Sequence, residues 1–63
     1  MTTTEAIALA EKYDIIIVQD GSQRCMVGHP ASNIGCWATV GDEESINKAI
    51  QYVAEQLDAR KRN

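Results

Sequence analysis

The sequence has little of several residue types on which function commonly rests. Among its 63 residues are no phenylalanine, one proline, one histidine and one tryptophan. No apolar run approaches the ~20 residues of a membrane-spanning helix. The segment from Met1 to Glu5 has neither the basic start nor the apolar stretch of a secretory signal peptide. We therefore expect a cytoplasmic protein, not bound to a membrane, with reduced cysteines.

Basic residues are also scarce. Six Lys and Arg stand against nine Asp and Glu, a net charge of −3. The basic residues are Lys12, Arg24, Lys48 and a C-terminal cluster, Arg60, Lys61 and Arg62. A nucleic-acid-binding domain needs clustered cations that displace phosphate counterions. The charge balance therefore makes nucleic acid an unfavourable partner, and a nucleic-acid-binding domain is the alternative to a protein-interaction domain.

Length and composition predict one small globular domain over 1–63. A 44% hydrophobic content argues against disorder. A chain of this size buries only ~60% of its unfolded surface. Such chains often gain stability from a disulfide, a metal or a second copy of themselves.

Helical patterns stand at both ends of the chain. Thr2 and Glu5 have the spacing of a capping box, which predicts a helix from about Thr3 to Lys12. Gly41-Asp42 predicts the turn and N-cap of a second helix. Its apolar stripe, at helical spacing, is Ile46, Ala49, Ile50, Val53, Ala54 and Leu57.

The middle of the chain predicts three strands. They are Asp14–Gln19, Arg24–Val27 and Gly35–Val40, separated by turn residues at 20–22 and 29–33. The expected fold is therefore α+β in the order α-β-β-β-α, with a three-stranded antiparallel sheet and both helices packed on one face.

The strand register divides the side chains between two faces. A turn about Gly21-Ser22 sets Val18 opposite Cys25, and a turn about Pro30-Ala31 sets Cys25 opposite Cys36. The face predicted to meet the helices is Ile16, Val18, Cys25, Val27, Cys36, Ala38 and Val40. The face predicted to stay open, and to form a protein interface, is Ile15, Ile17, Arg24, Met26, Trp37 and Thr39. Because the open face is mostly apolar, we expect a protein partner there, or a homodimer.

Trp37 allows two interpretations, the largest core residue or the centre of this interface. The second is favoured because the small neighbours Cys36 and Ala38 suit the covered face better.

Few residues of the sequence could form a disulfide, a metal site or a catalytic site. Cys25 and Cys36 could form a cross-strand disulfide, but two small thiols in a reducing compartment explain them more simply. With His29 they supply three ligands, one fewer than a structural zinc site requires. No base and orienting group accompany a nucleophile. We expect neither an enzyme, nor a metal site, nor a cofactor.

Two resemblances follow from these patterns. The order helix, three strands, helix resembles the double-stranded RNA-binding domain, which implies RNA binding through lysines at the start of the last helix. Asp42, Glu43 and Glu44 stand there instead, which predicts no RNA binding. The segment from Gly35 to Ile46 resembles the HicB-type antitoxin domain, where a Gly-Cys strand leads through a Gly-Asp turn into an acidic helix. That resemblance implies a toxin-like protein partner and dimerisation.

Overall fold

A computed structural model describes residues 2–61 of the chain and confirms the expected α+β fold. The elements in chain order are α1 (Thr3–Tyr13), β1 (Ile16–Gln19), β2 (Arg24–His29), the 3-10 turn η1 (Pro30–Ser32), β3 (Ile34–Thr39) and α2 (Glu43–Lys61). The three strands form an antiparallel meander in the order β1-β2-β3.

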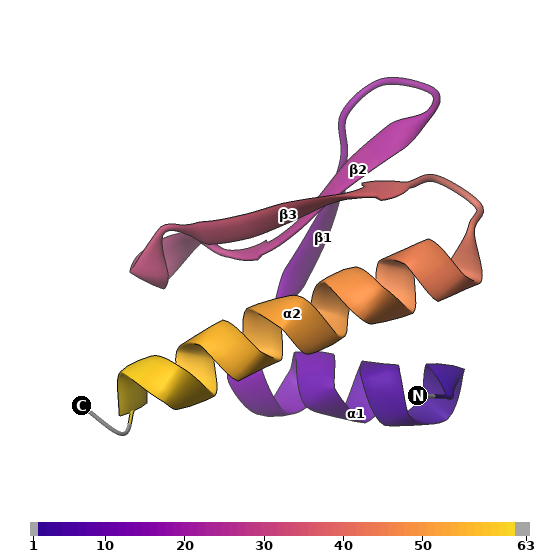
Figure 1. Ribbon diagram of the computed structural model, residues 1–63. Coiled ribbons are helices and arrows are strands. Elements are labelled where there is room, and N and C mark those ends of the chain that lie inside the picture. Colours follow the sequence, from indigo (N-terminus) through magenta and orange to yellow (C-terminus); the bar gives the residue numbers. More distant parts are fainter. Residues whose placement is uncertain (1, 62–63) are drawn as a thin grey trace.

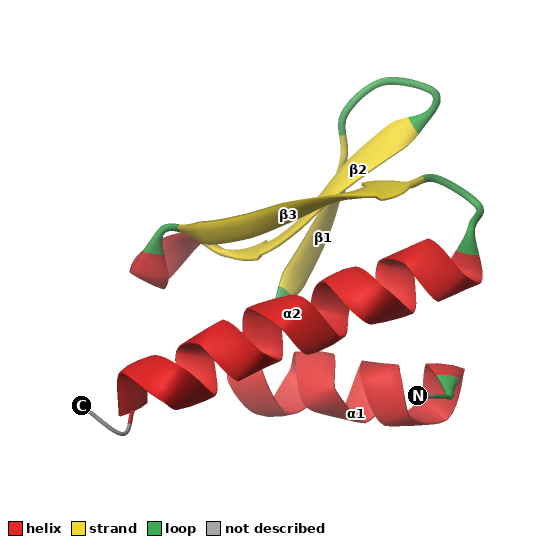
Figure 2. Ribbon diagram, in the orientation of Figure 1, coloured by secondary structure: helices red, strands yellow, loops and turns green. Residues whose placement is uncertain are grey.

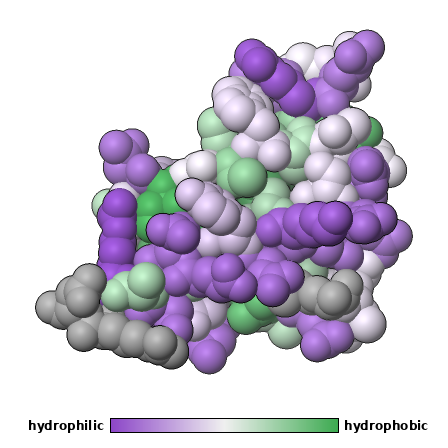
Figure 3. Space-filling view, viewed as in Figure 1, coloured by the Kyte–Doolittle hydropathy of each residue, from purple (hydrophilic) through white to green (hydrophobic). Residues whose placement is uncertain are grey.

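The helices lie on the same side of the sheet (Figures 1 and 2). The long helix α2 crosses beneath β2 and β3, and α1 lies beside α2. The turn between β1 and β2 projects away from the helices. Hydrophilic side chains cover the outward surface of α2, whereas paler and hydrophobic residues show above it, over the strands (Figure 3).

Helix α1 has the predicted capping box. The Glu5 backbone N–H donates to the Thr2 hydroxyl (3.2 Å), and the Glu5 carboxylate accepts from the Thr2 backbone N–H (3.1 Å). The Thr2 backbone N–H, which donates to the Glu5 carboxylate, is the main cause that lowers the pKa of Glu5, and the Thr2 side chain lowers it further. At its other end the helix stops at Asp14, whose φ of 56° is left-handed, and the Ile15 N–H donates to the Ala10 carbonyl (2.9 Å).

Helix α2 begins as the sequence predicts. The Asp42 carboxylate accepts from the Ser45 backbone N–H (3.3 Å), which satisfies one of the unpaired donors of the first turn. Ala49, Ile50 and Val53 are buried beneath the sheet, together with Ala54. The predicted stripe is therefore confirmed. Arg60 and Lys61 stand in the last turn, at the negative end of the helix dipole, and Arg62 lies outside the described residues.

The core is small and built mainly from small side chains. Its buried members are Ala6, Ile15, Cys25, Val27, Ala38, Ala49, Ile50, Val53 and Ala54. Val27 and Val53 are the largest side chains buried completely. Such a core permits close approach of α2 to the sheet.

The register of the first hairpin differs from the prediction by one residue. Ile17 stands opposite Val27 and Val18 opposite Met26. The reason is the loop, which holds three residues instead of two. The Asp20 N–H donates to the Arg24 carbonyl (3.0 Å), and Gly21 takes a φ of 90° between them. A shift of one residue turns every side chain of β1 to the other face.

The second hairpin is shifted by two residues, so its faces are as predicted. Its closing pair is His29 and Ile34, around the 3-10 turn and a left-handed Asn33. The predicted pairing of Cys25 with Cys36 is therefore wrong, because Cys25 lies opposite Ala38. Both thiols are free and still share the helix-facing side of the sheet.

Candidate functional site

Four of the six predicted interface residues lie on the open face of the sheet. They are Arg24, Met26, Trp37 and Thr39, which occupy paired positions on β2 and β3. The placement of Ile15 and Ile17 is wrong. Ile15 is buried in the core, 7% exposed, and Ile17 stands opposite buried Val27 on the helix-facing side. The one-residue shift of β1 is the cause.

That shift brings two other apolar residues to the open face. Ile16 and Val18 are paired with Gly28 and Met26, and both are about half exposed. Sequence reasoning missed them because it assumed a two-residue turn. A single glycine at the start of a turn indicates the number of turn residues only weakly, so the sequence offered little evidence for a three-residue turn. We call the resulting surface the open-face site; its members are Ile16, Val18, Arg24, Met26, Trp37 and Thr39.

Its central row crosses all three strands. Val18 pairs with Met26, and Met26 pairs with Trp37. The Trp37 side chain is 49% exposed, so Trp37 is not a core residue. The Arg24 guanidinium lies 4.2 Å from the centre of the Trp37 ring. At an exposed position this cation–π contact contributes ~0.5–1 kcal/mol and restrains the ring.

The charge of Arg24 is partly balanced. Its guanidinium stands 3.5 Å from the Asp20 carboxylate, and both side chains are about 60% exposed. An exposed pair of this kind contributes little to stability. The ion pair instead fixes the position of the Arg24 guanidinium, a cation at the border of an otherwise apolar row.

Next to this row the open face is hollowed by two glycines. Gly28 and Gly35 stand opposite each other, with Ile16 on the neighbouring strand. The hollow measures about 310 Å³. A Cβ on Gly28 would come 2.6 Å from the Ile34 carbonyl oxygen, whereas one on Gly35 would meet the Met26 sulfur at 2.7 Å. Met26 therefore leans over Gly35 and forms one wall of the hollow.

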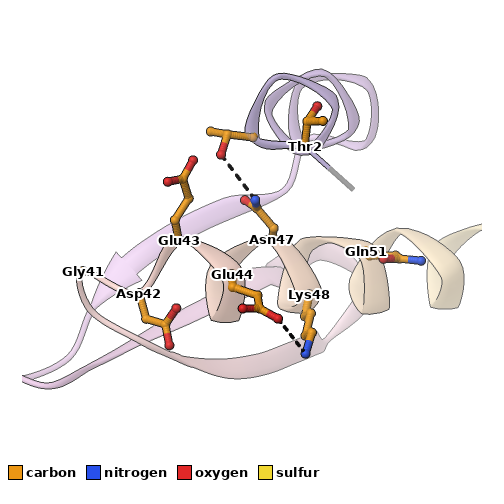
Figure 4. A pocket seen from close by; sticks show the side chains of 9 residues that line it. Thr2, Gly41, Asp42, Glu43, Glu44, Asn47, Lys48 and Gln51 are labelled. Carbon is orange, nitrogen blue, oxygen red and sulfur yellow. Dashed lines mark hydrogen bonds and ion pairs between the residues drawn. The ribbon is translucent and has the colours of Figure 1, made fainter.

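A larger hollow, of about 760 Å³, lies where the first turns of the two helices meet (Figure 4). Its charged residues are Asp42, Glu43, Glu44 and Lys48. Lys48 pairs with Glu44 at 3.3 Å, and the Asn47 amide donates to the Thr3 hydroxyl across the helices (3.4 Å). This is the position at which the RNA-binding resemblance requires lysines. The geometry therefore gathers acidic groups where phosphate contacts would have to form.

The other candidate residues are Cys25, Cys36 and His29, of which Cys25 and Cys36 share the helix-facing side of the sheet. Cys25 is buried in the core, and His29 ends β2 opposite Ile34. His29, which the sequence places among the turn residues at 29–33, belongs to β2 instead; it is half-buried, and its Nδ1 has no hydrogen-bond partner within residues 2–61. Over residues 2–61, no group of three or more His, Cys, Asp or Glu side chains is placed to hold a metal ion.

Comparison with protein-family models, with curated proteins and with solved structures finds no match to this chain. Neither α1 nor α2, the helices of the described part, is long and apolar enough to cross a membrane. The site must accordingly be interpreted from its own geometry.

Proposed function

We propose that this chain is a non-enzymatic protein-interaction domain that binds a protein partner through the open-face site. The observation that carries the proposal is the apolar row of Val18, Met26 and Trp37 on the sheet face opposite the helices. An antiparallel sheet with one solvated face normally carries polar residues there. A contiguous apolar patch on a small domain typically marks a contact surface.

The kinds of residue support a protein ligand in particular. Trp, Arg and Met are enriched in protein interfaces, and Trp and Arg are frequent among the residues that dominate binding energy. Here Trp37 and Arg24 are in contact, and Met26 adjoins them. The hollow over Gly28 and Gly35 supplies a concave feature beside this flat row, into which a partner side chain could insert.

Specificity would arise from this combination. A partner must present an apolar surface to the row and a side chain small enough for a hollow of about 310 Å³. The resemblance to antitoxin domains is consistent with a protein partner but does not identify one. Regulation or inhibition of that partner is the activity that we infer from a domain with a binding surface alone.

The test compares three immobilised proteins in extracts of the native host. Wild type is set against Trp37→Ala and against Glu55→Ala, a control because Glu55 on α2 is exposed and does not line the hollow that Trp37 borders. We expect a specific protein to be retained by wild type and Glu55→Ala and lost with Trp37→Ala. Retention by all three, or loss only with Glu55→Ala, would contradict the proposal. Retention of RNA in place of protein would also contradict it.

A further inference from the structure

The outer edge of β1 differs from that of β3 in how its backbone groups are occupied. In an antiparallel ladder, residues bonded to the neighbouring strand alternate with residues whose N–H and C=O point away. The Asp20 N–H donates to the Arg24 carbonyl (3.0 Å), so Val18 and Ile16 are the residues of β1 bonded toward β2. The backbone groups of Ile17 and Gln19 therefore point outward.

The β3 edge is closed in part by its own chain. The Thr39 N–H donates to the Ser45 hydroxyl (3.1 Å), and its carbonyl accepts from the Asp42 N–H (3.1 Å). The Trp37 carbonyl accepts from the Cys36 thiol at 3.6 Å. The beginning of α2 thus shields this edge.

The four residues of β1 include no charged residue and no proline, and their pairing with β2 is continuous, although the strand is short and is flanked by Asp14 and Asp20. Natural edge strands carry charges, prolines or bulges that discourage another strand from joining. The sequence of β1 is Ile-Ile-Val-Gln, and all four residues are exposed. Ile17 is 48% exposed on the helix-facing side, where Ile7 of α1, 53% exposed, borders the same groove of about 320 Å³.

We propose that a second copy of this chain pairs with β1 along this edge, antiparallel about a two-fold axis at Ile17, and extends the sheet to six strands. The apolar pattern selects this register. With Ile17 opposite the partner copy's Ile17, each Ile16 stands opposite a Val18, so apolar residues meet on both faces. Centring the axis on Val18 would instead set Ile17 against Gln19.

The same register uses the outward backbone groups. The two Ile17 residues exchange N–H and C=O bonds, and each Gln19 N–H reaches an Ile15 carbonyl. The Ile15 N–H is already bonded to Ala10, so the ladder ends there. A two-fold axis makes one surface complementary to itself, which is why a second copy is the occupant that this pattern fits.

The contact is small, and the association should be weak. A standard interface removes about 800 Å² from each partner, roughly a fifth of the 4361 Å² that this chain exposes. Pairing of one short strand covers less, so we expect a weak association that depends on protein concentration. Asp14 and Asp20 approach one another at the ends of the paired strands, and salt at ~0.15 M screens that repulsion.

The pairing concerns the backbone edge of β1 and does not rest on the protein partner proposed above, although the side chains of Ile16 and Val18 belong both to the paired strand and to the open-face site. Sedimentation equilibrium of wild type should show a monomer–dimer equilibrium. Ile17→Lys should raise the dissociation constant about tenfold or more. Ile17→Pro should do the same, since the lost N–H points away from β2. Tyr52→Lys and Trp37→Ala, altered at exposed positions off the edge, should dimerise like wild type.

Amide hydrogen exchange gives a second readout on folded wild-type protein. The Ile17 and Gln19 amides should become protected as concentration rises, while those of Ile16 and Val18 are protected throughout. A monomer at high concentration, a dimer unaffected by Ile17→Lys, or a dimer lost with Trp37→Ala would overturn the inference. The first two results leave the open-face proposal untouched.

Discussion

The register of β1 leads to opposite expectations for two adjacent isoleucines. Ile15 is 7% exposed within the core, whereas Ile16 is 47% exposed on the open face. Replacing a buried isoleucine by alanine removes its transfer free energy and leaves a cavity, a cost of about 2–5 kcal/mol. Replacing Ile16 removes only half-buried surface and leaves no cavity, so we expect ~1 kcal/mol or less.

These magnitudes are large for so small a protein. A domain of 63 residues has a free energy of unfolding of roughly 3–9 kcal/mol. Ile15→Ala should therefore unfold at much lower urea concentration than wild type, whereas Ile16→Ala should remain close to it. Ile15→Val, with an expected cost of about 0.5–1.5 kcal/mol, keeps the comparison measurable if the alanine variant is unfolded.

The assay is urea denaturation followed by circular dichroism, at protein concentrations low enough to keep the chain monomeric. Equal losses at the two positions, or a larger loss for Ile16→Ala, would refute the register and with it the composition of the open-face site. The larger loss for Ile16→Ala is the result that the pairing of Val18 with Cys25, suggested by the sequence, would give.

Three other expectations follow from the structure. Gly28→Ala should lower the free energy of unfolding by ~1–3 kcal/mol, because the new Cβ would press on the backbone of Ile34. Gly35→Ala should lower it by less, because the flexible end of the Met26 side chain can move away. Comparable urea midpoints for the two variants would contradict this expectation. In a pH series followed by NMR, the Glu5 carboxyl should titrate below its ordinary pKa of 4.5. The stability that the ionised Glu5 gives to α1 should be present above pH 4.5 and lost as the pH falls through the lowered pKa. A titration midpoint at or above 4.5 would count against the capping box. A generic RNA duplex at low salt should show no saturable shift in a gel, because the start of α2 is acidic; micromolar binding would show this charge argument to be wrong.

The order of the elements and the helix boundaries could be predicted from the sequence because their signals are local. The Thr2–Glu5 capping box and the Asp42 cap both form as their spacing indicates. The apolar stripe that includes Ile50 and Val53 repeats with the period of an α-helix, and this spacing predicts that the stripe is buried. Such signals depend on residues a few positions apart.

The composition of the site could be predicted only in part, because register depends on the length of each loop. A single residue added to the first loop moved Ile15 into the core and brought Ile16 outward. The second loop differed by two residues, and so Met26 and Trp37 kept their face. Asp14-Ile-Ile-Ile-Val offers no polar residue between Ile15 and Val18 that would mark the inner positions.

The central claim is that the open face of the sheet binds a protein. The most direct measurement is amide and side-chain NMR of the labelled chain during titration with the purified partner captured by the wild-type protein. We expect the largest shift changes at Val18, Met26 and Trp37, with Glu55, an exposed residue of α2 outside the hollow that Trp37 lines, unchanged. Changes concentrated on α2, with the Trp37 indole signal unmoved at saturation, would contradict the account.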